Sequence, residues 1–435
     1  MKRVSDFPSS IALNGADFFL LQLDRMMWQS SRCRNICTFV VRLDARLECR
    51  ELASYLSTNA AYQWICRLRL QKTWPFVLAK WVFNADIVLP AIDEYQGEQG
   101  DTLPSDLLQK PFNIEKQAAF RISLVQLKDG GSQLVFTWHH ALMDAHGGEI
   151  FIRQLGGEET ISPADWFSHN PVSALSLRAR ADIALQMKAF LCHVSRLPFI
   201  SLIGKKKRQQ AVLYHTLKFS QRQTQQMAVR ARDQGAGFLV SAFYLAVTSY
   251  AVAKVQHSRM PLDSDMLVPI PLDCRKRGVQ APVIGNQVTF LFYRIPLAAL
   301  ANIKTCVSAL MAQMKDLMRS ENPQHYLIMM DFLRRVPGWL YRMQLTSPTK
   351  GKMASFHYSD TGDSLDLYAQ LFGRSVSSVI HYPPNMYPPG LTFVFSRYQG
   401  ALQLTLGYME SVLTADELAL LLSELQLGLL GEAGL

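Results

Sequence analysis

The sequence predicts a mixed α/β protein with two domains. The chain has 435 residues, more than one ordinary hydrophobic core accommodates. Apolar residues make up 49% of it and charged residues 18%, which favours a large apolar interior such as a lined tunnel. Short β-type runs also alternate with helix-type runs. We expect a first domain over 1–185, a linker over 186–210 and a second domain over 211–435.

The first half contains a capped helix and a β-hairpin. Asn14 and Asp17 are placed to cap an amphipathic helix from Phe18 to Met27. The turn Lys-Asp-Gly-Gly-Ser at 128–132 joins two apolar, β-branched runs. The other elements expected are strand 38–43, helix 47–60, strands 118–127 and 133–138, and helix 147–154.

The second half of the chain follows a segment whose amino-acid composition changes along its length. Residues 173–210 begin as an Ala/Leu/Arg helix, turn apolar and end in the basic run 205–208. We interpret that run as a solvated loop, with a membrane-surface or carrier-protein contact as the alternative. Thr414 and Glu417 form a capping box for the last helix, which Gly428 is placed to end. The other elements expected are strands 213–219, 266–270, 287–294, 390–396 and 402–408, and helices 222–234, 236–256 and 300–320.

Net charge narrows the class of partner. The chain carries a formal charge of +10, which favours nucleic acid, an anionic membrane surface, or an acidic substrate or carrier. We exclude nucleic acid because no nucleic-acid-binding module motif is present. The first residues contain no apolar signal-peptide core, and the charge-free run 236–253 holds enough polar residues to favour a buried helix over a membrane span. We expect a cytoplasmic protein, with peripheral contact to the inner membrane face as an option.

The cysteines do not indicate a metal site. There are seven, an odd number, and most are scattered along the sequence. Only Cys33 and Cys37 are close together, and no second pair completes a zinc site. We expect reduced thiols and no metal.

The stretch 139–148, His-His-Ala-Leu-Met-Asp-Ala-His-Gly-Gly, is the most informative about chemistry. It follows the buried-strand pattern 134–138, and loops at strand ends often carry function. A neutral imidazole there can take a proton from an alcohol, amine or thiol. Asp144 can order the loop, and Gly147 and Gly148 precede a helix whose N–H groups could face an oxyanion or phosphate. From the residues alone, the histidine pair is catalytic, structural or metal-binding.

This stretch resembles the His-His-x-x-x-Asp signature of the acyltransferase superfamily with the chloramphenicol-acetyltransferase-like fold. That superfamily includes condensation domains and wax ester synthases. The order and spacing of other segments resemble the family over most of the chain. The sequence departs from the pattern at Ala145-His146, where the family has Gly directly after the Asp, and at Ser359-Asp360, where Ser-Asn is common. The further similar segments are 111–124, 268–277, 284–288, 358–363 and 392–417.

The resemblance implies two chloramphenicol-acetyltransferase-like α/β sandwich domains that form a pseudo-dimer with a central tunnel. His140 would be the general base that deprotonates an acceptor. Asp144 would hold the loop through an ion pair with Arg275. His139, Gly147 and Asn286 would support the site, and the weaker candidates are Ser359 and His146, with His357 and His381 expected to be incidental.

The resemblance also implies a thioester-dependent acyltransferase. The donor would be acyl-CoA or an acyl carrier protein, so coenzyme A or phosphopantetheine would be a co-substrate and no bound cofactor is expected. The acceptor would be a hydroxyl group of a lipid or secondary metabolite. The alternatives are a stand-alone condensation-type enzyme that forms an amide from an amine, and a non-catalytic carrier-protein docking module of the same fold.

Overall fold

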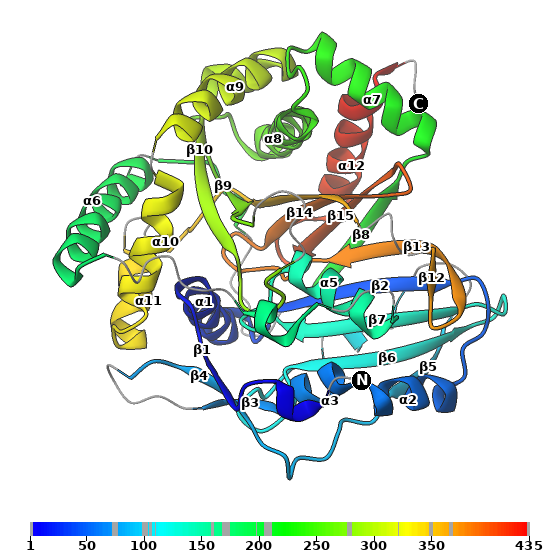
Figure 1. The fold of residues 1–435 in the computed structure, drawn as a ribbon. Coiled ribbons are helices and arrows are strands. Elements are labelled where there is room, and N and C mark those ends of the chain that lie inside the picture. Colours follow the sequence, from blue (N-terminus) through cyan, green and yellow to red (C-terminus); the bar gives the residue numbers. More distant parts are fainter. Residues whose placement is uncertain are drawn as a thin grey trace.

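Two layered α/β units lie against each other in the computed structural model (Figure 1). Helices α7, α8, α9 and α12 lie above one sheet, and α2 and α3 lie below the other. The helix bounds are α1 Gly15–Ser31, α2 Cys49–Thr58, α3 Ala60–Ile65, α5 Ala145–Leu155, α6 Leu177–Arg196, α7 Gln221–Asp233, α8 Val240–Arg259, α9 Ile303–Arg319, α10 Asn322–Leu333, α11 Gly338–Thr346 and α12 Ala415–Leu430. The structure describes residues 3–71, 77–97, 103, 107–108, 110–157, 161–167, 175–196, 198–203, 211–275, 281–320, 322–347, 351–364 and 369–432.

A six-stranded sheet forms the centre of the first unit. Its strand order is β12-β13-β2-β7-β6-β5. The expected hairpin is present as β6 and β7. Strands β12 and β13 come from the second half of the chain, and β13 pairs antiparallel with β2 so that His381 lies opposite Phe39. The bounds are β2 Ile36–Leu43, β5 Asp93–Gly97, β6 Phe120–Leu127, β7 Ser132–His139, β12 Gln370–Leu371 and β13 Arg374–Tyr382.

A four-stranded sheet with order β11-β14-β15-β8 forms the centre of the second unit. The ribbon of β9 and β10 lies beside it, and β9 contacts β11. The segment 358–363, which resembled a loop of the family, is part of strand β11. The bounds are β8 Val212–Lys218, β9 Met266–Asp273, β10 Val288–Ile295, β11 His357–Asp363, β14 Leu391–Tyr398 and β15 Ala401–Met409; a small third sheet holds β1 Ser10–Ala12, β4 Lys80–Phe83 and β3 Leu68–Gln71.

The helix ends follow local capping chemistry, with one correction. Asn14 caps α1 and Thr414 caps α12, each within a capping box, as expected. The prediction that Gly428 ends the last helix is wrong. Gly428 lies inside α12 because it packs against α8, where an added Cβ would come within 2.6 Å of a Val247 side-chain carbon. The helix ends at Gly431, whose positive φ of 76° suits glycine.

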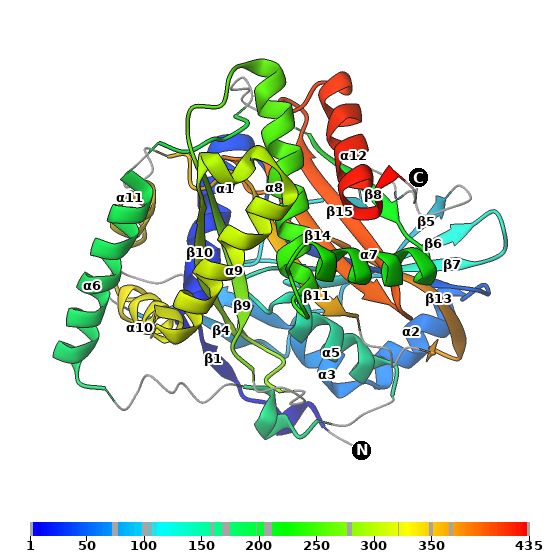
Figure 2. The same ribbon diagram turned by 90° about the horizontal axis from the view of Figure 1, so that it is seen from above.

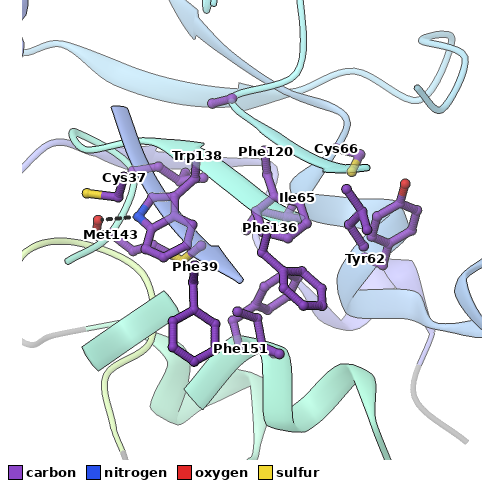
Figure 3. Close-up of a cluster of buried hydrophobic side chains, with 14 of the residues drawn as sticks. Cys37, Phe39, Tyr62, Ile65, Cys66, Phe120, Phe136, Trp138, Met143 and Phe151 are labelled. Atoms are coloured by element: carbon purple, nitrogen blue, oxygen red, sulfur yellow. Dashed lines mark hydrogen bonds between the residues drawn. The ribbon is translucent and has the colours of Figure 1, made fainter. Parts of the chain in front are cut away.

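Aromatic packing builds the first core. Trp138, Phe136 and Phe120 on the sheet face Phe151 of α5 (Figure 3). The rings of Phe120 and Phe151 lie 5.0 Å apart in an edge-to-face arrangement, which favours a fixed position for α5. This core fixes the strand end from which residues 139–148 leave the sheet.

The second core lies between α8 and the four-stranded sheet, where the rings of Tyr244 and Phe395 stack at 4.8 Å. The first core also takes in residues from the second half, such as Val283 and Val376. The first unit therefore contains residues from both halves of the chain. The domain boundaries 1–185, 186–210 and 211–435 stay predictions.

Helices α6, α10 and α11 lie together at one side of the molecule (Figures 1 and 2). Helix α6 runs through the start of the expected linker and packs on α10 through Ala184 and Met187, which contact Tyr326 and Met329. The basic run 205–208 lies outside the described residues. The apolar run 236–253 forms most of buried helix α8, and no helix in the described part of the chain is long and apolar enough to cross a membrane.

Candidate active site between the two units

A cavity of about 310 Å³ lies between the two units. The first unit contributes α1, β2, the end of β7 and β13, and the second contributes β9–β11, β14, α10 and α11. Aliphatic, aromatic and methionine side chains form most of its wall, so it suits an apolar chain. The polar residues on the wall are Asn35, Thr38, His140, Gln344, His357, Ser359, Thr361, His381 and Thr392.

His140 enters this cavity from the end of β7. Its backbone N–H donates to the carbonyl of Asn35 at 2.9 Å. Its own carbonyl accepts from Asn286 Nδ2 at 2.8 Å. One bond comes from each half of the chain, so the main chain of His140 is fixed on two sides and the half-buried imidazole faces the cavity from a rigid support.

Burial lowers the pKa of the His140 imidazole below its usual value of 6.5, although its own backbone carbonyl and the charge of Asp144 favour the protonated form. The ring is therefore neutral at neutral pH. Its Nδ1 is buried without a hydrogen bond of regular geometry in the described chain. Nε2 is then the nitrogen available to a ligand, and a neutral Nε2 facing an apolar cavity can accept a proton.

Asp144 is part of the scaffold, because its hydrogen bonds go to backbone N–H groups and to Arg275. Its carboxylate caps α5 by accepting from the Gly147 N–H at 2.7 Å. It also accepts from the Gln287 N–H at 2.8 Å and from both terminal nitrogens of Arg275 at 3.0 Å each. The expected Asp144–Arg275 pair is therefore present and bidentate. Burial opposes ionisation, but Arg275 outweighs it and lowers the pKa of Asp144.

Gly147 is required by close packing. A Cβ at this position would come within 2.4 Å of the Val283 carbonyl oxygen and 3.3 Å of the Arg275 guanidinium. Because Asp144 already occupies the Gly147 N–H, this helix end binds an internal carboxylate. The Gly147 N–H is therefore not free for an external oxyanion or phosphate.

His139 is not one of the residues that line the cavity. Its Nδ1 accepts from the Ala141 N–H at 3.2 Å, so its hydrogen is on Nε2. Nε2 lies 3.4 Å from Asp24 of α1. Burial raises the pKa of Asp24, but His139 and Arg34 outweigh it and lower that pKa to about 2. His139 thus ties β7 to α1 as a structural residue.

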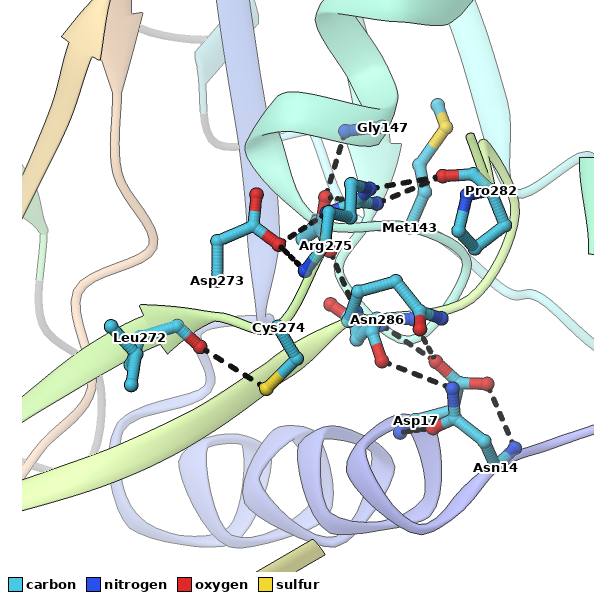
Figure 4. Close-up of polar contacts among 12 residues, drawn as sticks. Asn14, Asp17, Met143, Gly147, Leu272, Asp273, Cys274, Arg275, Pro282 and Asn286 are labelled. Carbon is cyan, nitrogen blue, oxygen red and sulfur yellow. Dashed lines mark hydrogen bonds and ion pairs between the residues drawn. The ribbon is translucent and has the colours of Figure 1, made fainter. Parts of the chain in front are cut away.

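Asn286 joins α1 to the histidine loop. Its Nδ2 donates to Asp17 at 2.8 Å, and its backbone N–H donates to Asp17 at 2.7 Å (Figure 4). Its Nδ2 also donates to the His140 carbonyl. Gly285 beside it donates to the Leu142 carbonyl with φ +87°, a conformation that favours glycine. Burial raises the pKa of Asp17 to about 7, although hydrogen bonds from Asn286 and Asn14 oppose the rise. The sequence predicted Asp17 only as a helix cap.

The remaining candidates divide between the cavity wall and the scaffold. Ser359 and Ala145 line the cavity, whereas His146 does not. His357 and His381, expected to be incidental, both line it. Among the described residues, no group of three or more His, Cys, Asp or Glu side chains is placed to hold a metal ion.

Comparison with known proteins gives structural relatives only. No family model and no curated protein matches the sequence. A trichothecene 15-O-acetyltransferase from Fusarium sporotrichioides is similar with a TM-score of 0.70 and 12% identity, over 97% of this chain and 95% of that one. The first condensation domain of the CDA synthetase has a TM-score of 0.65 and 14% identity, over 98% of each chain.

A third similar structure is the starter condensation domain of rhizomide synthetase, a mutant in complex with C8-CoA and Leu-SNAC. Its TM-score is 0.62 with 14% identity, over 98% of this chain and 95% of that one. At such low identity these matches establish the fold. The chain has the mixed α/β fold of condensation domains and chloramphenicol-acetyltransferase-like proteins, as the sequence resemblance implied.

Proposed function

We propose that this chain is an acyltransferase that moves an acyl group from a thioester to a hydroxyl acceptor, with His140 as the general base. One observation carries the proposal: a neutral imidazole, fixed through its main chain by both halves, faces an apolar cavity between them. The fold supports it, because one similar structure is an O-acetyltransferase and another was solved with C8-CoA.

The reaction needs one proton acceptor and no resident cofactor. Nε2 of His140 takes the hydroxyl proton as the acceptor oxygen attacks the thioester carbonyl. The tetrahedral intermediate then expels the thiolate, which takes that proton from the imidazolium. The result is one ester, one free thiol and a neutral His140. The thiol belongs to coenzyme A or to the phosphopantetheine arm of an acyl carrier protein, both acidic and suited to a chain of charge +10.

The cavity wall favours a hydroxyl over an amine. A primary amine is mostly an ammonium ion at neutral pH, and moving that charge into an apolar cavity is costly. A neutral alcohol enters without that cost, which suits a lipid or an apolar secondary metabolite. Amide formation from an amine is the alternative, and the similarity to condensation domains favours it. A cytoplasmic location, contact with the inner membrane face and a docking role remain open predictions.

The test is purified protein with acyl-CoA donors of increasing length and matched panels of alcohols and amines. Free thiol is measured and products are identified by mass spectrometry. We expect alcohol-dependent thiol release and an ester product. Amide products would favour the condensation-type alternative. If no donor releases thiol and the protein only binds an acyl carrier protein, the enzyme proposal is wrong and the docking module is favoured.

A further inference from the structure

A second histidine with a carboxylate partner lies on the wall of the same cavity. His381 of β13 is 5% exposed, and its Nε2 lies 2.5 Å from Oε1 of buried Glu149 on α5. The Ser364 hydroxyl lies 3.2 Å from the same nitrogen. The Phe39 ring packs on the imidazole at 4.6 Å. These contacts fix the orientation of the His381 ring.

The contacts also determine which ring nitrogen is available. Glu149 and Ser364 both contact the same ring nitrogen, Nε2, which is therefore occupied by the protein itself. Both hydrogen bonds of the ring within the described chain use Nε2. Nδ1 is the other ring nitrogen, and since His381 lines the cavity, Nδ1 can form a hydrogen bond with a bound molecule.

Strand β2 lies between β13, which carries His381, and β7, which ends next to His140. The His140 amide bonds to Asn35, and His381 pairs with Phe39, four positions along the line of β2. With about 3.3 Å per residue along the strand and about 4.8 Å to the strand on each side, the two Cα atoms are roughly 16 Å apart. His381 cannot share a reacting atom with His140, but one extended molecule can reach both.

We propose that His381 is a recognition residue for a hydroxyl or amine group at the far end of a long apolar substrate whose other end reacts at His140. The inference rests on the proposed function and names its substrate class: chains with a hydroxyl or amine group about thirteen bonds from the reacting group, since an extended chain advances about 1.2 Å per bond. The group is carried by either the acyl chain or the acceptor alcohol. An apolar chain end would leave Nδ1 without a partner, which costs binding.

Equilibrium binding tests this without requiring turnover. Calorimetry compares 1-dodecanol with 1,12-dodecanediol, and dodecanoyl-CoA with 12-hydroxydodecanoyl-CoA. We expect the hydroxylated member of one pair to bind wild type roughly tenfold more tightly, the scale of one satisfied buried hydrogen bond. The pair that shows the preference identifies the substrate that extends to His381. Equal affinities within both pairs in wild type would overturn the inference, whatever the variants do.

Two substitutions assign the preference to one nitrogen. His381→Gln keeps a polar group near the Nε2 position for Glu149 and removes Nδ1, so the affinity ratio should fall to about one. His257→Gln is the control for losing an imidazole, because His257 is exposed on α8 and is not part of the cavity wall, and should retain the ratio. A ratio that survives in His381→Gln contradicts the inference. Thiol release without any binding preference leaves the proposed function intact and removes this inference. A preference without thiol release supports recognition by His381 alone and overturns the proposed reaction at His140.

Discussion

His140 and His381 line one cavity, but the chain orients them in different ways. The carboxylate near His140 in sequence, Asp144, binds Arg275 and the α5 N-terminus and fixes the loop. The carboxylate at His381, Glu149, contacts the ring itself. The acid in the sequence motif is therefore part of the scaffold, and the acid outside the motif orients an imidazole. Closeness in sequence between an acid and a histidine does not show which of these roles the acid has.

The largest expected effect comes from breaking the scaffold at the His140 end. Asp144→Asn leaves Arg275, whose side chain is 3% exposed, as a buried charge with a weakened partner. We expect a loss of about 3–5 kcal/mol in the free energy of unfolding, measured by denaturant titration.

The matched control for that substitution is Glu48→Gln, which breaks an ion pair with Arg46 in which both side chains are more than half exposed. It should cost about 1 kcal/mol or less. Equal losses of unfolding free energy in the two variants would mean that the Asp144–Arg275 ion pair stabilises the protein no more than an exposed ion pair does.

A smaller effect is expected where α1 supports His140. Asn286→Ala removes the donor to the His140 carbonyl and one of the donors to Asp17. We expect the free energy of unfolding to fall by about 1–3 kcal/mol and kcat to fall with it, because the imidazole loses one of its two main-chain supports. Asn113→Ala, at an exposed position, should change stability by about 0.5 kcal/mol or less. An unchanged kcat would show that Asn286 only stabilises the fold.

The smallest effect is the pH dependence. His140 acts as a base only when neutral, and burial lowers its pKa below 6.5. As pH falls, kcat/KM should therefore stay nearly level to pH 6.5, with less than about a twofold loss there, and then fall about tenfold per pH unit below the lowered pKa. A fall in kcat/KM centred near pH 7 would contradict this prediction about His140. It would point instead to the titration of Asp17, whose pKa is about 7.

The sequence predicted the structure around His140 well, because the features there depend on neighbouring residues or on motifs that can be found along the sequence. The capping residues Asn14 and Thr414, the hairpin before the histidines and the Asp144–Arg275 pair are all present in the structure. The resemblance located Arg275 and Asn286, which are more than a hundred residues from the loop that they contact. The role of each residue in catalysis is still a prediction.

The His381 end was not predicted because tertiary pairing creates it. His381 and Glu149 are 232 residues apart and meet only because β13 crosses to the sheet of the first unit. Helices α10 and α11 were also missed, although both supply cavity residues such as Met330 and Leu345. Gly428 was interpreted as a helix end because its contact with Val247 is not visible in sequence. Close packing between distant elements decided each of these cases.

The most direct test of the central claim is the rate of thiol release by wild type, His140→Ala and His257→Gln with the best acyl-CoA and alcohol pair. His257 is exposed on α8 and serves as the control for losing an imidazole. We predict that His140→Ala lowers kcat by roughly 10²–10⁴-fold with an unchanged unfolding midpoint, the range expected for removing a general base, while His257→Gln retains the wild-type rate. A folded His140→Ala variant that releases thiol at the wild-type rate would contradict the account.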